Sequence, residues 1–173
     1  TWTVGNVTYY NVTIEKGNGW ALTQSANVTM NGGFTLIQGN YYTNNFNMSV
    51  GGNWDHRGGN FYPGSGTVTF IGPQDASLIG NTAFNNVVIQ KDDKHSLTIS
   101  GSPTTMHLFL YDGYLNGGTL TVNGNVTVNN GSFLFDGGNG TIQFINTTSY
   151  HDIIVNNGSG LTPNILINKT SAT

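Results

Sequence analysis

The fold of this chain is decided by the stretch Gly118-Thr119-Leu120-Thr121-Val122-Asn123-Gly124-Asn125-Val126-Thr127-Val128. Leu120 and Val122 alternate with threonine, and Val126 and Val128 do the same after an Asn-Gly pair. Alternation with a period of two is typical of a strand with one buried face and one polar face. The Asn-Gly pair is typical of a tight turn. The stretch therefore predicts two short strands joined by a turn.

The same alternation recurs along the rest of the chain. Val12 and Ile14 alternate with polar residues, as do Met48 and Val50. No segment has the composition of a helix, because Ala, Leu, Glu and Lys are sparse and Gly or Asn interrupts nearly every ten residues. The sequence therefore predicts an all-β fold.

The chain also repeats itself at long range. Three segments resemble one another: Tyr10-Asn11-Val12-Thr13-Ile14-Glu15-Lys16, Asn85-Asn86-Val87-Val88-Ile89-Gln90-Lys91 and Pro163-Asn164-Ile165-Leu166-Ile167-Asn168-Lys169. A second landmark, residues 66–71, returns as residues 140–145. Self-similarity of this kind is typical of like units stacked into an elongated body. We expect a single elongated β domain over residues 1–173, with repeats at about 10–84 and 85–162 and a partial third repeat at 163–173.

A shorter spacing indicates the architecture. Leu97, Leu120, Ile142 and Ile165 recur every 22 to 23 residues, which suits one turn of a β-solenoid. The longer period of about 75 residues is not a clean multiple of this spacing. The alternative is a β-sandwich with strand donation between subunits, because Asn-Gly is also the preferred two-residue hairpin turn.

Composition excludes several classes of function. Charged residues make up only 8% of the chain, and the net charge is -3. Five Lys and Arg in total argue against a nucleic-acid partner, which needs clustered positive charge. There is no apolar run of about 18 residues, so we expect no membrane-spanning helix. With no cysteine, the chain has no disulfides or thiolate metal sites.

The cadence of the strands resembles that of a known group of proteins. Residues 84–89 and 118–126, with the Gly-Thr-Val-Thr-Phe run at 66–70, look like the repeats of extracellular, adhesin-like β-solenoid surface proteins of bacteria and archaea. The resemblance covers most of residues 10–170 and rests on a low-complexity pattern. It implies a secreted protein at the cell surface with a role in surface structures or adhesion, and it carries no catalytic residues.

The strongest chemical signal is the N-glycosylation pattern Asn-x-Ser/Thr. It occurs at Asn6, Asn11, Asn27, Asn47, Asn125, Asn130, Asn139, Asn146, Asn157 and Asn168. Chance gives roughly five matches in a chain of this composition, so ten is an enrichment. In Asn125-Val126-Thr127 the buried Val sends Asn and Thr to the same outer face. We expect exposed acceptors and covalent N-glycans at several sites. The alternative is that a strand rich in Asn, Val and Thr produces the pattern without glycosylation.

Other polar clusters indicate neither catalysis nor metal binding. Asp55-His56-Arg57 is the densest cluster, and it lacks the second carboxylate of acid–base chemistry, so a solvated loop is the simpler interpretation. Asp92 and Asp93 offer oxygens to Ca²⁺, but a turn between strands explains them better. We expect no catalytic residues, no metal ligands and no cofactor, and we expect that the protein is not an enzyme. A polysaccharide-active β-helix is the weakest alternative, because the acids are scattered and the chain has one Arg.

Aromatic residues leave one further alternative open. Eight candidates are Tyr9, Tyr10, Tyr41, Tyr42, Phe61, Tyr62, Tyr111 and Tyr114. Such rings most often pack at strand ends or between subunits, and they also form platforms on which sugars stack. A carbohydrate-binding surface adhesin is therefore the second hypothesis.

Both ends of the sequence have the character of strands. Trp2 and Val4 lie in one such segment, and Ile165, Leu166 and Ile167 open the third repeat. A solenoid end without a cap exposes unpaired backbone groups, and head-to-tail joining of like ends generates an open fibre. The leading hypothesis is therefore an extracellular filament or sheath subunit that polymerises through these residues, with itself as partner. The alternative is an excerpt from a longer repeat protein.

Overall fold

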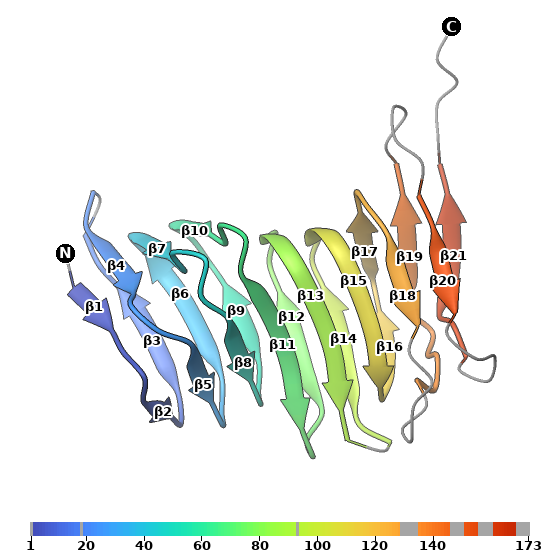
Figure 1. Cartoon of the computed structure of the whole chain (residues 1–173), viewed down its shortest axis with the longest axis horizontal. Coiled ribbons are helices and arrows are strands. Elements are labelled where there is room, and N and C mark those ends of the chain that lie inside the picture. The colour runs from blue at the N-terminus through green and yellow to red at the C-terminus, as the bar shows by residue number, and fades with distance from the viewer. Residues whose placement is uncertain are drawn as a thin grey trace, which may run out of the picture.

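The computed structural model is an all-β solenoid, in which the chain winds around one long axis and stacks strands turn upon turn (Figure 1). The structure describes residues 2–17, 19–92, 94–128, 135–145, 151–155 and 161–168. Every strand pair among these residues is parallel. The predicted β-solenoid is therefore confirmed, and a sandwich is not formed, because sandwiches pair their strands antiparallel.

Three parallel sheets form the walls of the solenoid. Sheet A contains β1 (Trp2–Val4), β4 (Ala21–Gln24), β7 (Asn40–Tyr42) and β10 (Asn60–Tyr62). Sheet B contains β2 (Thr8–Tyr9), β5 (Val28–Met30), β8 (Met48–Val50), β11 (Thr67–Gly72), β13 (Ala83–Lys91), β15 (Thr104–Asp112), β17 (Thr119–Val122), β18 (Val126–Val128), β19 (Thr141–Phe144), β20 (Ile153–Val155) and β21 (Asn164–Ile167). Sheet C contains β3 (Val12–Glu15), β6 (Phe34–Gln38), β9 (Trp54–His56), β12 (Ala76–Ile79), β14 (Ser96–Ser100) and β16 (Tyr114–Gly117).

The cross-section of the solenoid changes along its axis. Each of the first turns contributes one strand to each sheet, as β1, β2 and β3 do. The next turns have two strands each, one long and one short, because the nine-residue strands β13 and β15 take the place of separate strands in sheets A and B. Towards the C-terminal end the wall divides again, since β17 and β18 both pair with β15. Both ends of the solenoid therefore present shorter, divided turns.

The interior is filled by alternate side chains that stack in columns from turn to turn. One column along sheet B consists of residues that the register pairs in sequence, each at most 3% exposed: Val28, Met48, Val68, Val87, Leu108 and Val126. Full burial of such a side chain contributes about 1.5–3 kcal/mol. Period-two alternation in the sequence thus becomes a continuous apolar core.

Aromatic rings fill the wider N-terminal part of the core. Trp54 is fully buried, and its ring centroid lies 4.4 Å from that of Phe34 and 4.9 Å from that of Phe61. Tyr41 and Phe61 stack at 6.0 Å. Burial in this cluster raises the pKa of the Tyr41 hydroxyl. The large rings occupy the space enclosed where three walls meet.

Turn length explains how the sequence repeats relate to the fold. Hydrogen bonds between neighbouring turns join residues from 18 to 27 positions apart, so the turns are unequal. Leu120, Ile142 and Ile165 are paired neighbours in sheet B, whereas Leu97 lies in sheet C. The segment around Val12 lies in sheet C, and the related segments of the repeat lie in sheet B. The spacing of about 75 residues therefore returns the chain to the same wall for residues 66–71 and 140–145, which both lie in sheet B, but not from the segment around Val12 to the segment around Val87.

Candidate functional site

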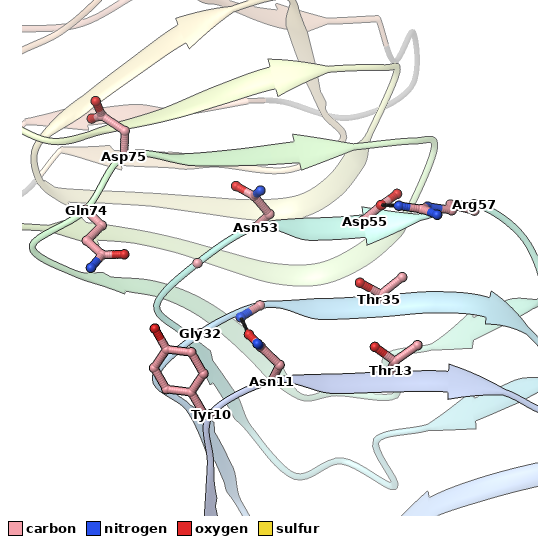
Figure 2. A pocket seen from close by; sticks show the side chains of 12 residues that line it. Tyr10, Asn11, Thr13, Gly32, Thr35, Asn53, Asp55, Arg57, Gln74 and Asp75 are labelled. Atoms are coloured by element: carbon pink, nitrogen blue, oxygen red, sulfur yellow. Dashed lines mark hydrogen bonds and ion pairs between the residues drawn. The ribbon is translucent and has the colours of Figure 1, made fainter.

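A shallow polar groove of about 520 Å³ lies over the outer face of sheet C in the first turns (Figure 2). The register aligns Thr13, Thr35 and Asp55 in one outward column across β3, β6 and β9. Beside this column, Gly33 lies between Asn11 and Asn53 and contributes no side chain. The groove is therefore hollow over backbone and bordered by amides and hydroxyls.

Close stacking of the turns requires the glycines beneath the groove. A Cβ atom on Gly33 would lie 2.8 Å from the Asn53 carbonyl oxygen, and one on Gly52 would lie 3.0 Å from the Gly32 carbonyl carbon. Both clashes are with backbone, which cannot move aside without separating the turns. The floor of the groove is thus fixed by the packing of the solenoid itself.

An ion pair borders one end of the groove. Arg57 donates from Nε and approaches with a terminal nitrogen to the same Asp55 oxygen, Oδ2, at 2.7 Å in each case. The Asp55 side chain is 13% exposed and that of Arg57 is 64% exposed. The hydrogen bond to Asp55 raises the pKa of the Arg57 guanidinium. Of the predicted Asp55-His56-Arg57 cluster, the structure brings the first and last residues to the groove.

His56 is held away from the groove by the core. Its Nδ1 lies 2.9 Å from the Thr82 hydroxyl, and that hydroxyl accepts a hydrogen bond of 2.8 Å from Trp54 Nε1. The loop predicted for this segment is wrong, because Trp54–His56 form β9. A buried Trp anchors the segment as a strand, and the glycines that suggested a loop lie on either side of it.

Asp75 lies at the other end of the groove, where the chain enters β12. Its Oδ1 accepts hydrogen bonds from the Ser96 backbone nitrogen at 2.7 Å and from the Ser96 hydroxyl at 3.1 Å. The backbone hydrogen bond from Ser96 is the main reason that the pKa of the Asp75 carboxyl is lowered. Asp75 is therefore ionised at neutral pH while it ties one turn to the next.

Asparagine side chains make the same kind of tie at many corners. Within the predicted glycosylation set, five Oδ1 atoms accept a backbone N–H from a neighbouring turn at 2.7 to 3.1 Å: those of Asn11, Asn27, Asn47, Asn125 and Asn139. Asparagines outside the set do so too, as Asn53 and Asn81 show. Each such bond contributes about 1 kcal/mol. We call these contacts the asparagine ladder.

The structure places the predicted acceptors as follows. Six are exposed: Asn6, Asn11, Asn27, Asn47, Asn139 and Asn168. Asn125 is half-buried. Asn130, Asn146 and Asn157 lie outside the described residues. The ladder uses Oδ1, whereas a glycan is attached to the amide nitrogen, so the two roles do not compete for one atom.

The predicted assembly residues lie on edge strands. Trp2 and Val4 belong to β1, which pairs with β4. Ile165, Leu166 and Ile167 belong to β21, which pairs with β19. Ile167 continues the inward column of Phe144, yet it is 65% exposed, whereas Phe144 is 2% exposed. The C-terminal edge of the described solenoid thus carries apolar side chains that no further turn covers.

Lys91 is a site that sequence reasoning missed. It is fully buried at the end of β13, where Nζ donates to the carbonyl oxygens of Gly51 at 2.8 Å and Ile71 at 2.6 Å. Burial lowers the pKa of the Lys91 ammonium to about 8. A signal was present in the sequence, because Lys91 has the inward parity of Val87 and Ile89.

Metal ligation receives no support from the described part of the chain. There, no group of three or more His, Asp or Glu side chains could hold a metal ion. His95 N donates to the Asp92 carbonyl at 3.0 Å, which confirms the turn predicted between these strands, while Asp93 lies outside the described residues. His107 Nδ1 accepts the Asn125 N–H, and His151 Nδ1 contacts the Gly124 carbonyl. Both rings therefore hold neighbouring turns together.

Two further findings bear on function. No helix with the length and apolar character needed to cross a membrane occurs among the described residues. No protein-family model, curated protein or solved structure matches the chain. Function must therefore be inferred from the geometry of the chain itself.

Proposed function

We propose that this protein is an extracellular structural subunit that joins copies of itself head to tail into a filament or sheath. The observation that carries the proposal is the exposure of β20, in which Ile153, Ile154 and Val155 are each 40–45% exposed. Ile153 and Val155 pair with Val126 and Val128, which are fully buried. A further turn stacked on β20 would bury Ile153 and Val155 in the same way.

The strand edges at the two ends of the solenoid support the proposal that a second copy of the chain provides this further turn. Within the described residues, β1, β2 and β3 each pair on one side, and so do β20 and β21. Strands run in the same direction throughout, so the free edge of one copy can extend the parallel sheet of the next. The two ends lie at opposite poles of the molecule (Figure 1), which makes the contact heterologous and the assembly open.

The polar outer surface supports an extracellular setting and covalent glycans. With only 8% charged residues, the surface is wetted by Asn, Thr and Ser. Six exposed acceptor asparagines offer positions for N-glycans along the sides of a fibre. Glycans on the sides would keep fibres dispersed without blocking the ends.

The test uses two variants that each block one end. Ile167→Lys places a charge on the C-terminal edge, and Val4→Lys places one on the N-terminal edge. Thr69→Lys, on the outer face of central strand β11, is the matched control. We expect filaments by negative-stain microscopy for the unmodified protein and for the control, and monomers for each end variant alone.

Mixing the end variants distinguishes head-to-tail joining from other modes. Each retains one competent end, so the mixture should form a heterodimer and nothing longer by light scattering. Homodimers of either variant alone would show that like ends meet and would contradict the proposal. The proposal would also be contradicted if the unmodified protein remained monomeric at all concentrations.

A further inference from the structure

The groove on sheet C lies on the side of the solenoid, so its role is separate from assembly at the ends (Figure 2). Its lining is polar, and its floor is fixed by stacked backbone. We propose that this groove binds a neutral oligosaccharide. The charge balance of the groove, its donors and acceptors, and one exposed aromatic ring support this ligand.

Charge balance excludes strongly charged ligands. The guanidinium of Arg57 is already paired with Asp55, so it does not offer an unpaired positive charge to a phosphate, sulfate or uronate. Asp75 adds one carboxylate with a 73% exposed side chain. A single residual negative charge is too little to hold a polycation against salt. The groove therefore suits an uncharged ligand.

The hydrogen-bonding groups match the hydroxyls of a sugar. Asn11 and Asn53 use Oδ1 to accept backbone N–H groups, which fixes each amide and leaves its Nδ2 group as the donor. Asp55 is contacted at Oδ2, so Oδ1 remains an acceptor, and Thr13 and Thr35 offer hydroxyls that act either way. Sugar hydroxyls also donate and accept, so a mixed array recognises them better than a row of acceptors alone.

The strands set the spacing of this array. Neighbouring parallel strands lie about 4.8 Å apart, so the column from β3 through β6 to β9 repeats its polar groups at that interval. Inter-turn bonds hold the amides in place before any ligand arrives. A preorganised site of this kind loses little conformational entropy on binding. The row is long enough for a short oligosaccharide rather than a single sugar.

Tyr10 provides the apolar contact. It lines the groove beside Asn11, and 69% of its surface is exposed. An aromatic ring packs well against the C–H face of a pyranose, while its hydroxyl stays in water. Trp20 is also exposed, at 58%, but it does not line the groove, so it provides a matched control.

The experiment is a glycan array probed with the intact folded protein, followed by calorimetric titration of the best neutral oligosaccharide. The array holds neutral glucan, mannan and galactan oligosaccharides, uronate-containing and sulfated ones, and chitosan fragments. We expect binding to be confined to neutral members and to change little between about 0.1 and about 0.5 M NaCl. Tyr10→Ala and Arg57→Ala should each weaken it about fivefold or more, and Trp20→Ala should leave it unchanged.

Several results would overturn the inference. One is that the protein binds no neutral glycan on the array. Another is that binding is confined to charged glycans and is lost when salt is added. Unchanged binding by both Tyr10→Ala and Arg57→Ala would place the ligand elsewhere. Circular dichroism of each variant separates a lost contact from a lost fold. Filament formation by these variants is scored independently, so failure here leaves the assembly proposal to its own test.

Discussion

Lys91 is the residue whose chemistry differs most from its surroundings. An ammonium group is buried among apolar columns, where two carbonyl oxygens from two other turns accept its hydrogen bonds. Because burial lowers its pKa from 10.5 to about 8, the folded state binds this proton less tightly than the unfolded chain does. The cost of burying the charge is present below pH 8 and is relieved as the pH rises towards 10.5.

We therefore predict that Lys91 makes stability increase with pH in this window. Lys91→Met removes the titrating group, so the unmodified protein should gain stability relative to this variant between pH 8 and 10.5. Guanidinium unfolding midpoints of both proteins at several pH values measure the difference. A difference that is constant across the window would show that Lys91 keeps its ordinary pKa.

Asn47 tests whether the asparagine ladder and glycosylation are separate roles. Its Oδ1 accepts the Thr67 N–H at 3.0 Å. Asn47→Ala should lower stability by about 1 kcal/mol because this acceptor is lost, whereas Asn47→Asp should stay close to the unmodified protein. Thermal unfolding of protein made without glycosylation measures both effects.

The same position has a separate readout for the glycan. Asn47→Asp and Ser49→Ala both destroy the acceptor pattern, and Ser49→Ala leaves the ladder residue in place. In the native host, we expect each variant to be lighter than the unmodified protein by one glycan. Equal intact masses would show that Asn47 carries none.

At the scale of elements, the corners between strands are the most demanding positions. A Cβ atom on Gly51 would lie 2.3 Å from the carbonyl oxygen of Asn31 in the preceding turn. Gly51→Ala should therefore destabilise the protein by about 1–3 kcal/mol or more. Gly5→Ala is the control, because its Cβ would lie 3.7 Å from Ser25 Oγ, an ordinary contact. Equal unfolding midpoints for the two variants would contradict the close stacking of the corners.

The positions of the strands were predictable from the alternation of apolar and polar residues. The sheet that each strand joins was not. Val12 and Val87 sit in closely similar segments, yet they lie in sheets C and B, because the turns between them have unequal lengths. Local pattern specifies which side chains face inward, but it does not count residues around a turn. The groove was missed for the same reason: Asn11, Asn53 and Asp75 become neighbours only after the turns are stacked. Asp55 and Arg57 were noticed in the sequence because only one residue separates them.

At the scale of the whole molecule, each turn contacts mainly the turns next to it. Such a body is most stable where turns are covered on both sides and least stable at its ends. β13 and β15 are long and paired on both edges, whereas β1 and β20 are short and paired on one. We predict slowest amide hydrogen exchange in β13 and β15 and fastest exchange in β1 and β20. Mass spectrometry of peptides from the unassembled protein measures this, and uniform protection would contradict it.

The aromatic cluster has a consequence for spectroscopy. All three tryptophans lie within the first 54 residues, and Trp54, which is fully buried, sits among Phe34, Phe61 and Phe84. The far half of the core consists mainly of Leu, Val and Ile, which emit no fluorescence. Tryptophan emission therefore reports the N-terminal turns alone, while far-ultraviolet circular dichroism reports every turn. A lag between the two signals during denaturation would reveal the end from which the solenoid unwinds.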